Sequence, residues 1–501
     1  MLPGTSGTDA RRPASSMAWR TAIIIAVAVA TRLMTFGNPI LYTDEEFYFA
    51  AGRALANGAL PFVDVWDRKP IGLFLIYAAP AALPGSLGIW AYQAMALLCA
   101  AATALIVARL ADAAGWSRGS ILAGVAYLAW ITVAGGQGGQ SPVFYNLAMA
   151  LAALLIVERD RPALGRGAVA MLVVGVAIQI KYTAALEGIF FGLWLMVDDW
   201  KHGRKVIVVI GRGAVLATIA LLPTLVAVLV YAGLGELSAF VFANFESIFS
   251  RNADPMREQL ANLAKATAIL LPLLAMALGA GPSAEERIAG SRLFLRGWLL
   301  AALLAFALLP PWTDHYALPV LLPAAAVAAG FLGHARGRRI GGALIVIAVI
   351  AGQTSLVMDR QRRGTPAQFG SLVQAVGRGP GCLYVYSSSS MLYPATGRCA
   401  VSRYVFPSHL TRERENGAVG ADQMTEMRAI FAKLPAVVVM GPPYDGERPD
   451  IRAAALGLLA RDYRVTARVT LGRKRVAVYQ SRTVAQSTGA IAHFDWARKR
   501  S

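Results

Sequence analysis

Eleven apolar segments, each close to the length of a membrane-spanning helix, follow one another through residues 1–358. A helix needs about 20 mainly apolar residues to cross the hydrocarbon core of a bilayer, and a shorter one requires the bilayer to thin around it. This pattern predicts a polytopic α-helical membrane protein. The predicted spans are Trp19–Phe36, Leu87–Leu110, Gly119–Ala134, Val143–Val157, Gly167–Ile180, Thr183–Val197, Val206–Tyr231, Leu260–Ala280, Leu293–Leu309, Tyr316–Gly333 and Ile340–Met358.

The composition indicates the same class of protein. Hydrophobic residues make up 56% of the chain and charged residues only 15%, whereas soluble globular proteins carry about 25% charged residues. These values exclude a cytosolic enzyme, a disordered chain and a small disulfide-rich secreted domain. Three cysteines are too few for a metal cluster or a disulfide scaffold.

The distribution of positive charge predicts the orientation of the spans. With the N-terminus in the cytoplasm, the cytoplasmic segments contain eighteen Lys and Arg residues and the opposite loops contain six. This bias follows the positive-inside rule and favours an odd number of spans, which places the C-terminal region outside. The positive charge of the first 358 residues therefore follows membrane orientation, and we expect no nucleic-acid partner.

Residues 359–501 differ in composition from the spans and contain 22 Lys and Arg against 10 Asp and Glu residues. We expect a periplasmic α/β domain over residues 359–483 and a disordered tail at 484–501. Such a basic domain can contact anionic lipid or an acidic glycan, or can simply present a solvated surface. The predicted strands are Leu383–Ser387, Ala436–Met440, Val465–Thr470 and Val476–Gln480, and the predicted helices are Ala421–Lys433 and Ile451–Asp462.

Three adjacent acids follow the first span, in the first outer loop. Thr43 and Glu46 fit a capping box at the start of a helix that ends before Gly58. Acids also favour a helix N-terminus in general, so this local role explains Glu46 well and Asp44 and Glu45 in part. The alternative for Asp44 is a carboxylate held at the membrane boundary, where it acts as a base toward a substrate arriving from outside.

The first outer loop, residues 38–86, also contains a short apolar stretch at Ile71–Leu83 that includes Pro80. Counting this stretch as a span would reverse the side of every later loop and would destroy the charge bias. We therefore predict that it forms a re-entrant or interfacial helix.

Several cationic and polar residues are predicted to lie near the same outer boundary. Ionisable residues at membrane depth are costly and tend to be functional, so these residues are candidates for binding an anionic substrate. The ordinary alternatives are snorkelling for Arg32, a solvated turn for Arg68 and a plain interfacial role for His315. Lys181 stands alone in a strongly apolar stretch, which favours an anionic partner. The candidates are Arg32, Arg68, Lys69, Lys181, His315 and Tyr316.

Several common catalytic motifs are missing from the sequence. It contains no glycine-rich nucleotide loop, no His/Cys cluster with metal-ligand spacing and no Ser-His-Asp motif. A cytoplasmic ATP-driven machine is therefore not expected. A transferase with its acids and cations on the outer side needs an activated donor that is carried by the membrane.

These features together resemble the GT-C superfamily of polytopic glycosyltransferases, and within it the bacterial relatives of dolichyl-phosphate-mannose protein mannosyltransferases and of the lipid A aminoarabinose transferase. The most specific feature is the pair of acids at its position after the first span. The resemblance extends over most of the chain. It rests on Asp44-Glu45, Tyr48, Gly58–Pro61, Asp67–Pro70, Lys181-Tyr182, His315-Tyr316, Pro319, Pro323, Tyr393 and Arg403-Tyr404.

The resemblance implies roles for individual residues. Asp44 matches the catalytic acid of the family and Glu45 matches its acidic neighbour, while Lys69 and Lys181 match positions that look like phosphate ligands. The sequence departs from the family at residues 135–142, where many relatives carry an acid and this chain has none. The departure leaves open a second catalytic carboxylate and a divalent cation bound through it.

The resemblance also implies a function. It predicts an inverting glycosyltransferase in the bacterial inner membrane that moves a sugar from a polyprenyl-phosphate donor to a lipid, glycan or protein acceptor of the cell envelope. Two alternatives remain, a transporter of lipid-linked sugars or polysaccharides and a glycan polymerase or ligase. A transporter needs no base, and a polymerase usually places its chemistry in a large later outer loop.

Two cysteines, Cys382 and Cys399, lie 17 residues apart in the predicted outer domain. A turn-like stretch before Cys399 allows the chain to return beside Cys382. An oxidising periplasm would then favour a disulfide, worth about 3 kcal/mol for a loop of this length. The alternative is two unrelated buried thiols.

Overall fold

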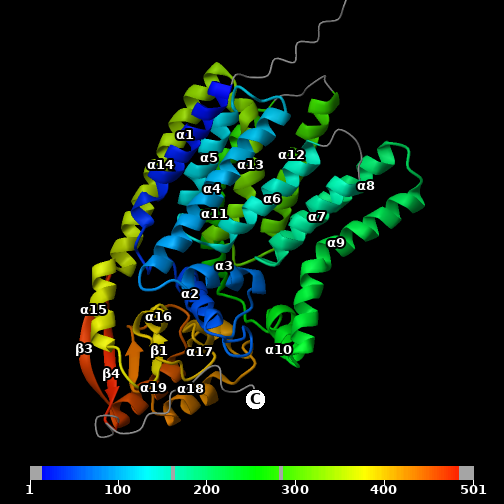
Figure 1. The fold of residues 1–501 in the computed structure, drawn as a ribbon. Helices are drawn as coiled ribbons and strands as arrows, with labels where there is room; N and C mark the ends of the chain where they lie inside the picture. Colours follow the sequence, from blue (N-terminus) through cyan, green and yellow to red (C-terminus); the bar gives the residue numbers. More distant parts are fainter. Residues whose placement is uncertain (1–13, 159–163, 281–285, 484–501) are drawn as a thin grey trace, which may run out of the picture.

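The computed structural model describes residues 14–158, 164–280 and 286–483, and the predicted tail at 484–501 lies outside them. Eleven long helices form an elongated bundle, and a small sheet domain lies at one end of it (Figure 1). The bundle helices are α1 (Ala14–Arg32), α4 (Leu87–Ala113), α5 (Ser120–Val133), α6 (Ser141–Val157), α7 (Leu164–Ile178), α8 (Ala184–Lys201), α9 (Val206–Gly233), α11 (Met256–Leu278), α12 (Glu286–Ala307), α13 (Leu318–Leu332) and α14 (Ala335–Arg363).

Each of the eleven predicted spans corresponds to one of these helices. Within the described residues, seven helices are long and apolar enough to cross a membrane. The helices α5, α6 and α7 are apolar but shorter, with 14, 17 and 15 residues, and α8 contains three acids. The helices themselves are therefore confirmed, whereas the crossing of the bilayer by all eleven stays a prediction.

The helix α13 lies at the centre of the bundle and packs against α5, α11 and α12. Apart from Val327, its stretch of residues 324–330 contains only alanine and glycine. Small residues allow helix backbones to approach closely, which is a main source of helix association in lipid. A Cβ added to Gly119 would lie 2.0 Å from the carbonyl oxygen of Ala329. The contact between α13 and the start of α5 therefore requires glycine.

Two further helices, α2 (Thr43–Ala56) and α3 (Ile71–Ala81), pack against each other between the bundle and the sheet domain (Figure 1). The approach is close, because a Cβ added to Gly52 would lie 2.7 Å from the carbonyl carbon of Tyr77. The helix α2 ends before Gly58, which has a φ of 89°, as the sequence predicts. The short helix α3 is also present where we expect it, and its interfacial placement stays a prediction.

The predicted capping box at the start of α2 is wrong. The N-cap residue of this helix is Tyr42, which makes no side-chain cap hydrogen bond. The Glu46 carboxylate instead accepts a hydrogen bond of 2.6 Å from Arg363, which lies 317 positions further along the chain at the end of α14. Arg363 also donates to the hydroxyl of Thr43 at 2.7 Å. The two residues therefore tie the first outer loop to α14, a role that local sequence does not reveal.

The C-terminal domain contains a four-stranded sheet in the order β1-β2-β4-β3, in which only β1 and β2 are parallel. All four predicted strands and both predicted helices are present, with ends that differ by a few residues. The four residues of β2 are all buried, as expected for an uninterrupted apolar strand. The elements are α15 (Pro366–Val376), β1 (Leu383–Ser387), α16 (Leu392–Thr396), α17 (Ser408–Thr411), α18 (Gln423–Ala432), β2 (Val437–Met440), α19 (Pro449–Asp462), β3 (Tyr463–Leu471) and β4 (Lys474–Ser481).

A disulfide joins Cys382 to Cys399 in this domain, with Cα atoms 4.5 Å apart. Next to it, the backbone N–H of Leu383 donates a hydrogen bond of 2.8 Å to the carbonyl of Cys399. The segment after the disulfide is thereby held against the outer edge of β1. The third cysteine, Cys99, is a partly buried free thiol in α4.

Candidate active site

Two lysines from distant parts of the chain lie near each other at the end of the bundle next to the sheet domain. Lys69 lies directly before α3, and Lys181 lies in the turn between α7 and α8. The turn and α3 touch at Gly72, where an added Cβ would lie 2.5 Å from the carbonyl oxygen of Gln179. Burial and the nearby charge of Lys69 lower the pKa of Lys181 to about 8. The close packing of the turn against α3 therefore brings the positive charges of Lys69 and Lys181 near each other.

The carboxylate of Asp44 lies beside these lysines, in the first turn of α2, where the helix dipole favours an anion. Burial alone would raise the pKa of Asp44, but Lys69 and His315 oppose this effect. A hydrogen bond from Gln140 and the charge of Lys181 add to the opposition, and the pKa lies below its ordinary value. Asp44 is therefore an anion at neutral pH. It is also partly exposed, so a substrate can reach it.

His315 and Tyr316 lie beside Lys181 and Asp44, and both are partly exposed. They belong to the short helix η3 (Asp314–Ala317), which leads into α13. The Nζ atom of Lys181 lies 4.5 Å from the centre of the Tyr316 ring, within the range of a cation–π contact. Burial and the charge of Lys181 lower the pKa of His315 to about 4. The imidazole is therefore neutral at pH 7 and can accept or donate a proton in a hydrogen bond.

Glu45 does not face the substrate side, in contrast to its predicted direct catalytic role. It is only 1% exposed and packs against the glycines of the second outer loop, so that a Cβ added to Gly138 would lie 2.3 Å from its carboxylate. Burial raises the pKa of Glu45 to about 7, although the Gly139 backbone and Arg32 favour the anion. We therefore assign Glu45 a structural role, in which it packs against the second outer loop next to Asp44.

Arg32 is also directed into the protein. It is 1% exposed, so it does not snorkel to water. Its guanidinium donates hydrogen bonds to three successive carbonyls, those of Gly136 at 2.5 Å, Gln137 at 2.7 Å and Gly138 at 3.2 Å. The predicted role of Arg32 as a substrate ligand is therefore corrected, because these bonds hold the second outer loop in shape.

The second outer loop, residues 135–142, supplies groups that the sequence reasoning missed. It has no acid, but Gln140 bonds to Asp44 and Gln137 accepts a hydrogen bond from Tyr42. The carbonyl of Gly139 accepts a hydrogen bond of 2.6 Å from Tyr77 in α3. The repeated glycines and glutamines of this loop could have indicated such a role. Glycine allows close approach of the backbone, and glutamine supplies a neutral hydrogen-bonding group.

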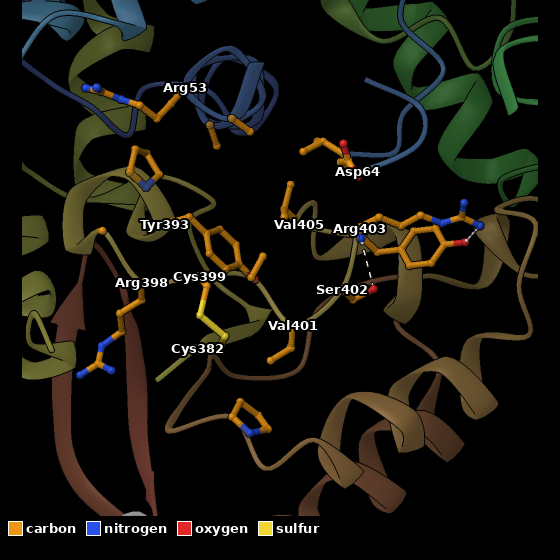
Figure 2. Close-up of a pocket in the computed structure, with 18 of the residues that line it drawn as sticks. Arg53, Asp64, Cys382, Tyr393, Arg398, Cys399, Val401, Ser402, Arg403 and Val405 are labelled. Carbon is orange, nitrogen blue, oxygen red and sulfur yellow. Dashed lines mark hydrogen bonds between the residues drawn. A yellow bond between two sulfur atoms is a disulfide. The ribbon is translucent and has the colours of Figure 1, made fainter. Parts of the chain in front are cut away.

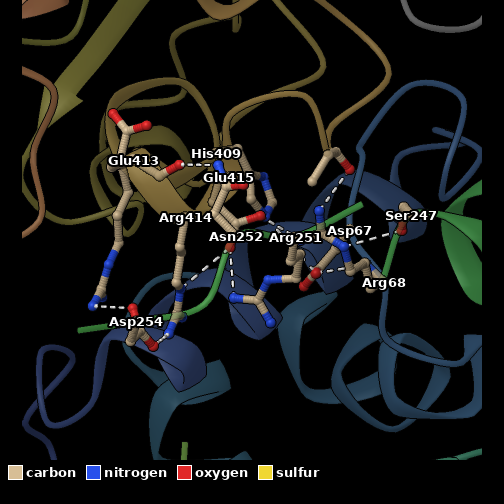
Figure 3. Close-up of polar contacts among 12 residues, drawn as sticks. Asp67, Arg68, Ser247, Arg251, Asn252, Asp254, His409, Glu413, Arg414 and Glu415 are labelled. Atoms are coloured by element: carbon tan, nitrogen blue, oxygen red, sulfur yellow. Dashed lines mark hydrogen bonds and ion pairs between the residues drawn. The ribbon is translucent and has the colours of Figure 1, made fainter. Parts of the chain in front are cut away.

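Arg68 connects the first outer loop to the rest of the outer side (Figure 3). It donates hydrogen bonds to Ser247 at 3.0 Å, to Glu415 at 2.6 Å and to the carbonyl of Ala418 at 2.6 Å. Glu415 also accepts a hydrogen bond of 2.6 Å from Arg251. Since all three nitrogens of Arg68 are engaged, its predicted substrate role is corrected to a structural one. We call the cluster of Asp67, Arg68, Arg251, His409 and Glu415 the outer clasp.

Lowering the pH should weaken the ionic interactions of the outer clasp. Burial lowers the pKa of His409 to about 4. Burial would raise the pKa of Glu415, but Arg251 and Arg68 outweigh it and hold the pKa at about 2. Both values lie below those of an unfolded chain, about 6.5 and 4.3, so the folded state loses stability as the pH falls through these ranges. Between pH 7 and pH 4.5 we expect the melting temperature of the purified protein to fall relative to that of a His409→Gln variant. Parallel melting curves for the two proteins would contradict this role of His409.

A metal site was left open by the sequence and is not supported by the residues present. Within residues 14–158, 164–280 and 286–483, no group of three or more His, Cys, Asp or Glu residues could hold a metal ion. The polar partners of Asp44 are two lysines, a histidine and a glutamine. Because the positive charges of two lysines act on Asp44, this set of groups does not fit a protein-held cation.

Comparisons with known proteins agree with this architecture. No protein-family model and no curated protein sequence matches the chain. The crystal structure of ArnT from Cupriavidus metallidurans bound to undecaprenyl phosphate superposes with a TM-score of 0.61 at 15% identity, over 93% of this chain and 98% of that one. The apo state of the same protein gives 0.61 at 16% identity. An oligosaccharyltransferase from Archaeoglobus fulgidus gives only 0.46, over 84% of this chain and 67% of that one. The chain therefore has the GT-C fold of a membrane protein, in the form seen in ArnT.

Proposed function

We propose that this chain is an inverting glycosyltransferase that takes a sugar from a polyprenyl-phosphate donor and transfers it to an acceptor outside the inner membrane. The observation that carries the proposal is an ionised, accessible Asp44 beside Lys69 and Lys181 at the outer end of a lipid-embedded bundle. The ArnT structure with bound undecaprenyl phosphate supports a donor of this class.

The chemistry needs two kinds of group, and both lie at this site. Asp44 accepts the proton of the acceptor hydroxyl or amine as that group attacks the sugar C1. The bond from C1 to the phosphate oxygen breaks, and the positive charge that develops on the sugar is stabilised by the same carboxylate. Lys69 and Lys181 stabilise the departing lipid phosphate, which needs positive charge and no proton. The attack from the face opposite the phosphate inverts the configuration.

The proposed orientation follows the charge bias of the loops. The N-terminus lies in the cytoplasm, and the site and the C-terminal domain lie in the periplasm of a bacterial cell. The acceptor is a lipid, glycan or protein of the cell envelope.

The direct test is transfer of labelled sugar from a synthetic polyprenyl-phosphate donor by the purified protein in lipid. We expect release of polyprenyl phosphate and an acceptor-linked product with the opposite anomeric configuration. A protein that moves the intact donor across the bilayer without cleaving it would contradict the proposal and would favour a transporter.

Lys181→Ala should weaken donor binding about ten- to a hundredfold, because a charge-assisted contact to phosphate is worth about 1.5–3 kcal/mol. Lys69→Ala should act in the same direction but less strongly, since Lys69 is shared with Asp67 at 4.0 Å. Donor affinity can be measured by titration in detergent, with Lys474→Ala at the exposed start of β4 as the matched control. Unchanged affinity and turnover in Lys181→Ala would reject the phosphate role.

A further inference from the structure

A large cleft lies apart from Asp44, next to the C-terminal domain. It is a cleft of about 1600 Å³ between α2 and the loops of the C-terminal domain (Figure 2). Pockets for small molecules usually measure about 300–1000 Å³ and often lie between domains. The size of this cleft therefore suits a ligand of several linked units. Its lining includes Arg53 and Asp64 on one side and Tyr393, Arg403 and Lys433 on the other.

Two arginines of the cleft, Arg53 and Arg403, keep hydrogen-bonding capacity, whereas Arg398 donates to four backbone carbonyls. Arg53 donates to the carbonyl of Leu83 at 2.7 Å, and its buried Nε has no hydrogen-bond partner among the described residues. Arg403 donates to the hydroxyl of Tyr404 at 3.0 Å. An arginine side chain has five N–H groups, so each of these two can bind a further acceptor. Both side chains are partly exposed.

One lysine, Lys433, and two acids, Asp64 and Glu426, also line the cleft. Lys433 is exposed and donates to the carbonyl of Val401 at 2.9 Å, and an ammonium group has three donors. The two acids are already bonded, because Asp64 accepts from the backbone N–H of Leu60 at 2.7 Å and Glu426 accepts from Ser402 at 2.6 Å. The lining carries four cations, Arg53, Arg398, Arg403 and Lys433, against these two acids, so its net charge is positive.

The geometry of the sheet disfavours a peptide in this cleft. Extended peptides commonly bind by adding a strand to an exposed sheet edge. The edge strand beside the cleft is β1, and Leu383 already pairs there with Ala400 and bonds to Cys399. The cleft instead presents the partly exposed Tyr393 among cations. Such a surface suits a sugar chain with acidic groups.

We propose that the cleft binds an acidic saccharide, a sugar chain with carboxylate or phosphate groups, as the acceptor. This inference rests on the proposed glycosyltransferase function, because it names the acceptor class of the same enzyme. The helix α2 connects the two sites, with Asp44 in its first turn and Arg53 in its last turn. Nine residues of helix correspond to roughly 14 Å. A bound saccharide of several linked units is therefore long enough to reach from the cleft to Asp44.

The test is direct binding of defined saccharides to the full-length protein in nanodiscs, without donor. Tetragalacturonate is the acidic probe, maltotetraose is the neutral saccharide of equal length, and tetra-aspartate is the acidic peptide. Calorimetric titration should show the strongest binding for tetragalacturonate. Lys433→Gln and Arg403→Gln should each weaken this binding about tenfold, as expected for the loss of one charge-assisted hydrogen bond. Arg468→Gln, an exposed arginine of β3 outside the cleft, should leave the affinity unchanged.

The outcomes separate this inference from the proposed function. Asp44→Asn should bind tetragalacturonate as the wild type does, since Asp44 does not line the cleft. If binding depends on Lys433 and Arg403 but the protein transfers no sugar, the cleft is supported as a saccharide-binding site and the glycosyltransferase function is contradicted. Equal binding of maltotetraose or tetra-aspartate would overturn the acidic-saccharide assignment, as would sugar transfer whose acceptor KM is the same in wild type, Lys433→Gln and Arg403→Gln.

Discussion

Asp44→Asn should reduce sugar transfer about 10²- to 10⁴-fold, which is the usual effect of removing a general base. The substitution keeps the size of the side chain and the hydrogen bond with Gln140, but asparagine cannot take the acceptor proton. It also removes the negative charge that stabilises the sugar in the transition state. The measurement is turnover of a labelled polyprenyl-phosphate donor by purified protein in lipid, together with the melting temperature and the donor affinity, which should stay close to those of the wild type.

The matched control is Asp445→Asn, which makes the same change at an exposed position of the C-terminal domain and should leave turnover unaltered. Near-wild-type turnover of Asp44→Asn would reject Asp44 as the base. The same variant also separates the function classes, because a transporter of lipid-linked sugar needs no base and would tolerate asparagine.

The helices and strands were predictable because they depend on local patterns. An apolar run of about 20 residues has few alternatives to a helix in lipid, and each predicted run is a helix. The C-terminal strands were found in the same way, from short apolar runs bounded by turn residues. The ends of α14 show the limit of this reasoning. This helix continues to Arg363, past the predicted domain boundary at residue 358, because polar residues with good helix propensity extend it out of the bilayer.

The roles of the three acids were not predictable, because burial depends on tertiary contacts. Asp44, Glu45 and Glu46 are adjacent in the sequence, and successive residues of a helix point in different directions. Only Asp44 is partly exposed, whereas Glu45 and Glu46 are 1% and 3% exposed. The partner of Glu46 is Arg363, which no local motif connects to it. Local sequence therefore predicts the segment that carries the three acids, whereas tertiary packing decides which of the carboxylates is exposed.

Arg32→Gln should destabilise the protein by at least about 1–3 kcal/mol, the usual cost of leaving a buried hydrogen-bond acceptor without its donor. Three successive loop carbonyls would lose their donor, and the buried carboxylate of Glu45 would lose a nearby cation. Transfer should fall as well, because the same loop carries Gln140, which bonds to Asp44. Thermal unfolding in lipid and donor turnover would measure the two effects.

A double-mutant cycle between Arg32→Gln and Glu45→Gln tests the physical reason for this loss. If the two side chains interact, the double variant should be more stable than the sum of the single changes predicts, by about 0.5–3 kcal/mol. The pKa of Glu45 is about 7, so more of this side chain is ionised at pH 8 than at pH 6, and the coupling should grow over this range. Coupling near zero at both values, with Arg32→Gln still unstable, would assign the whole effect to the loop carbonyls and would remove Glu45 from the support of the site.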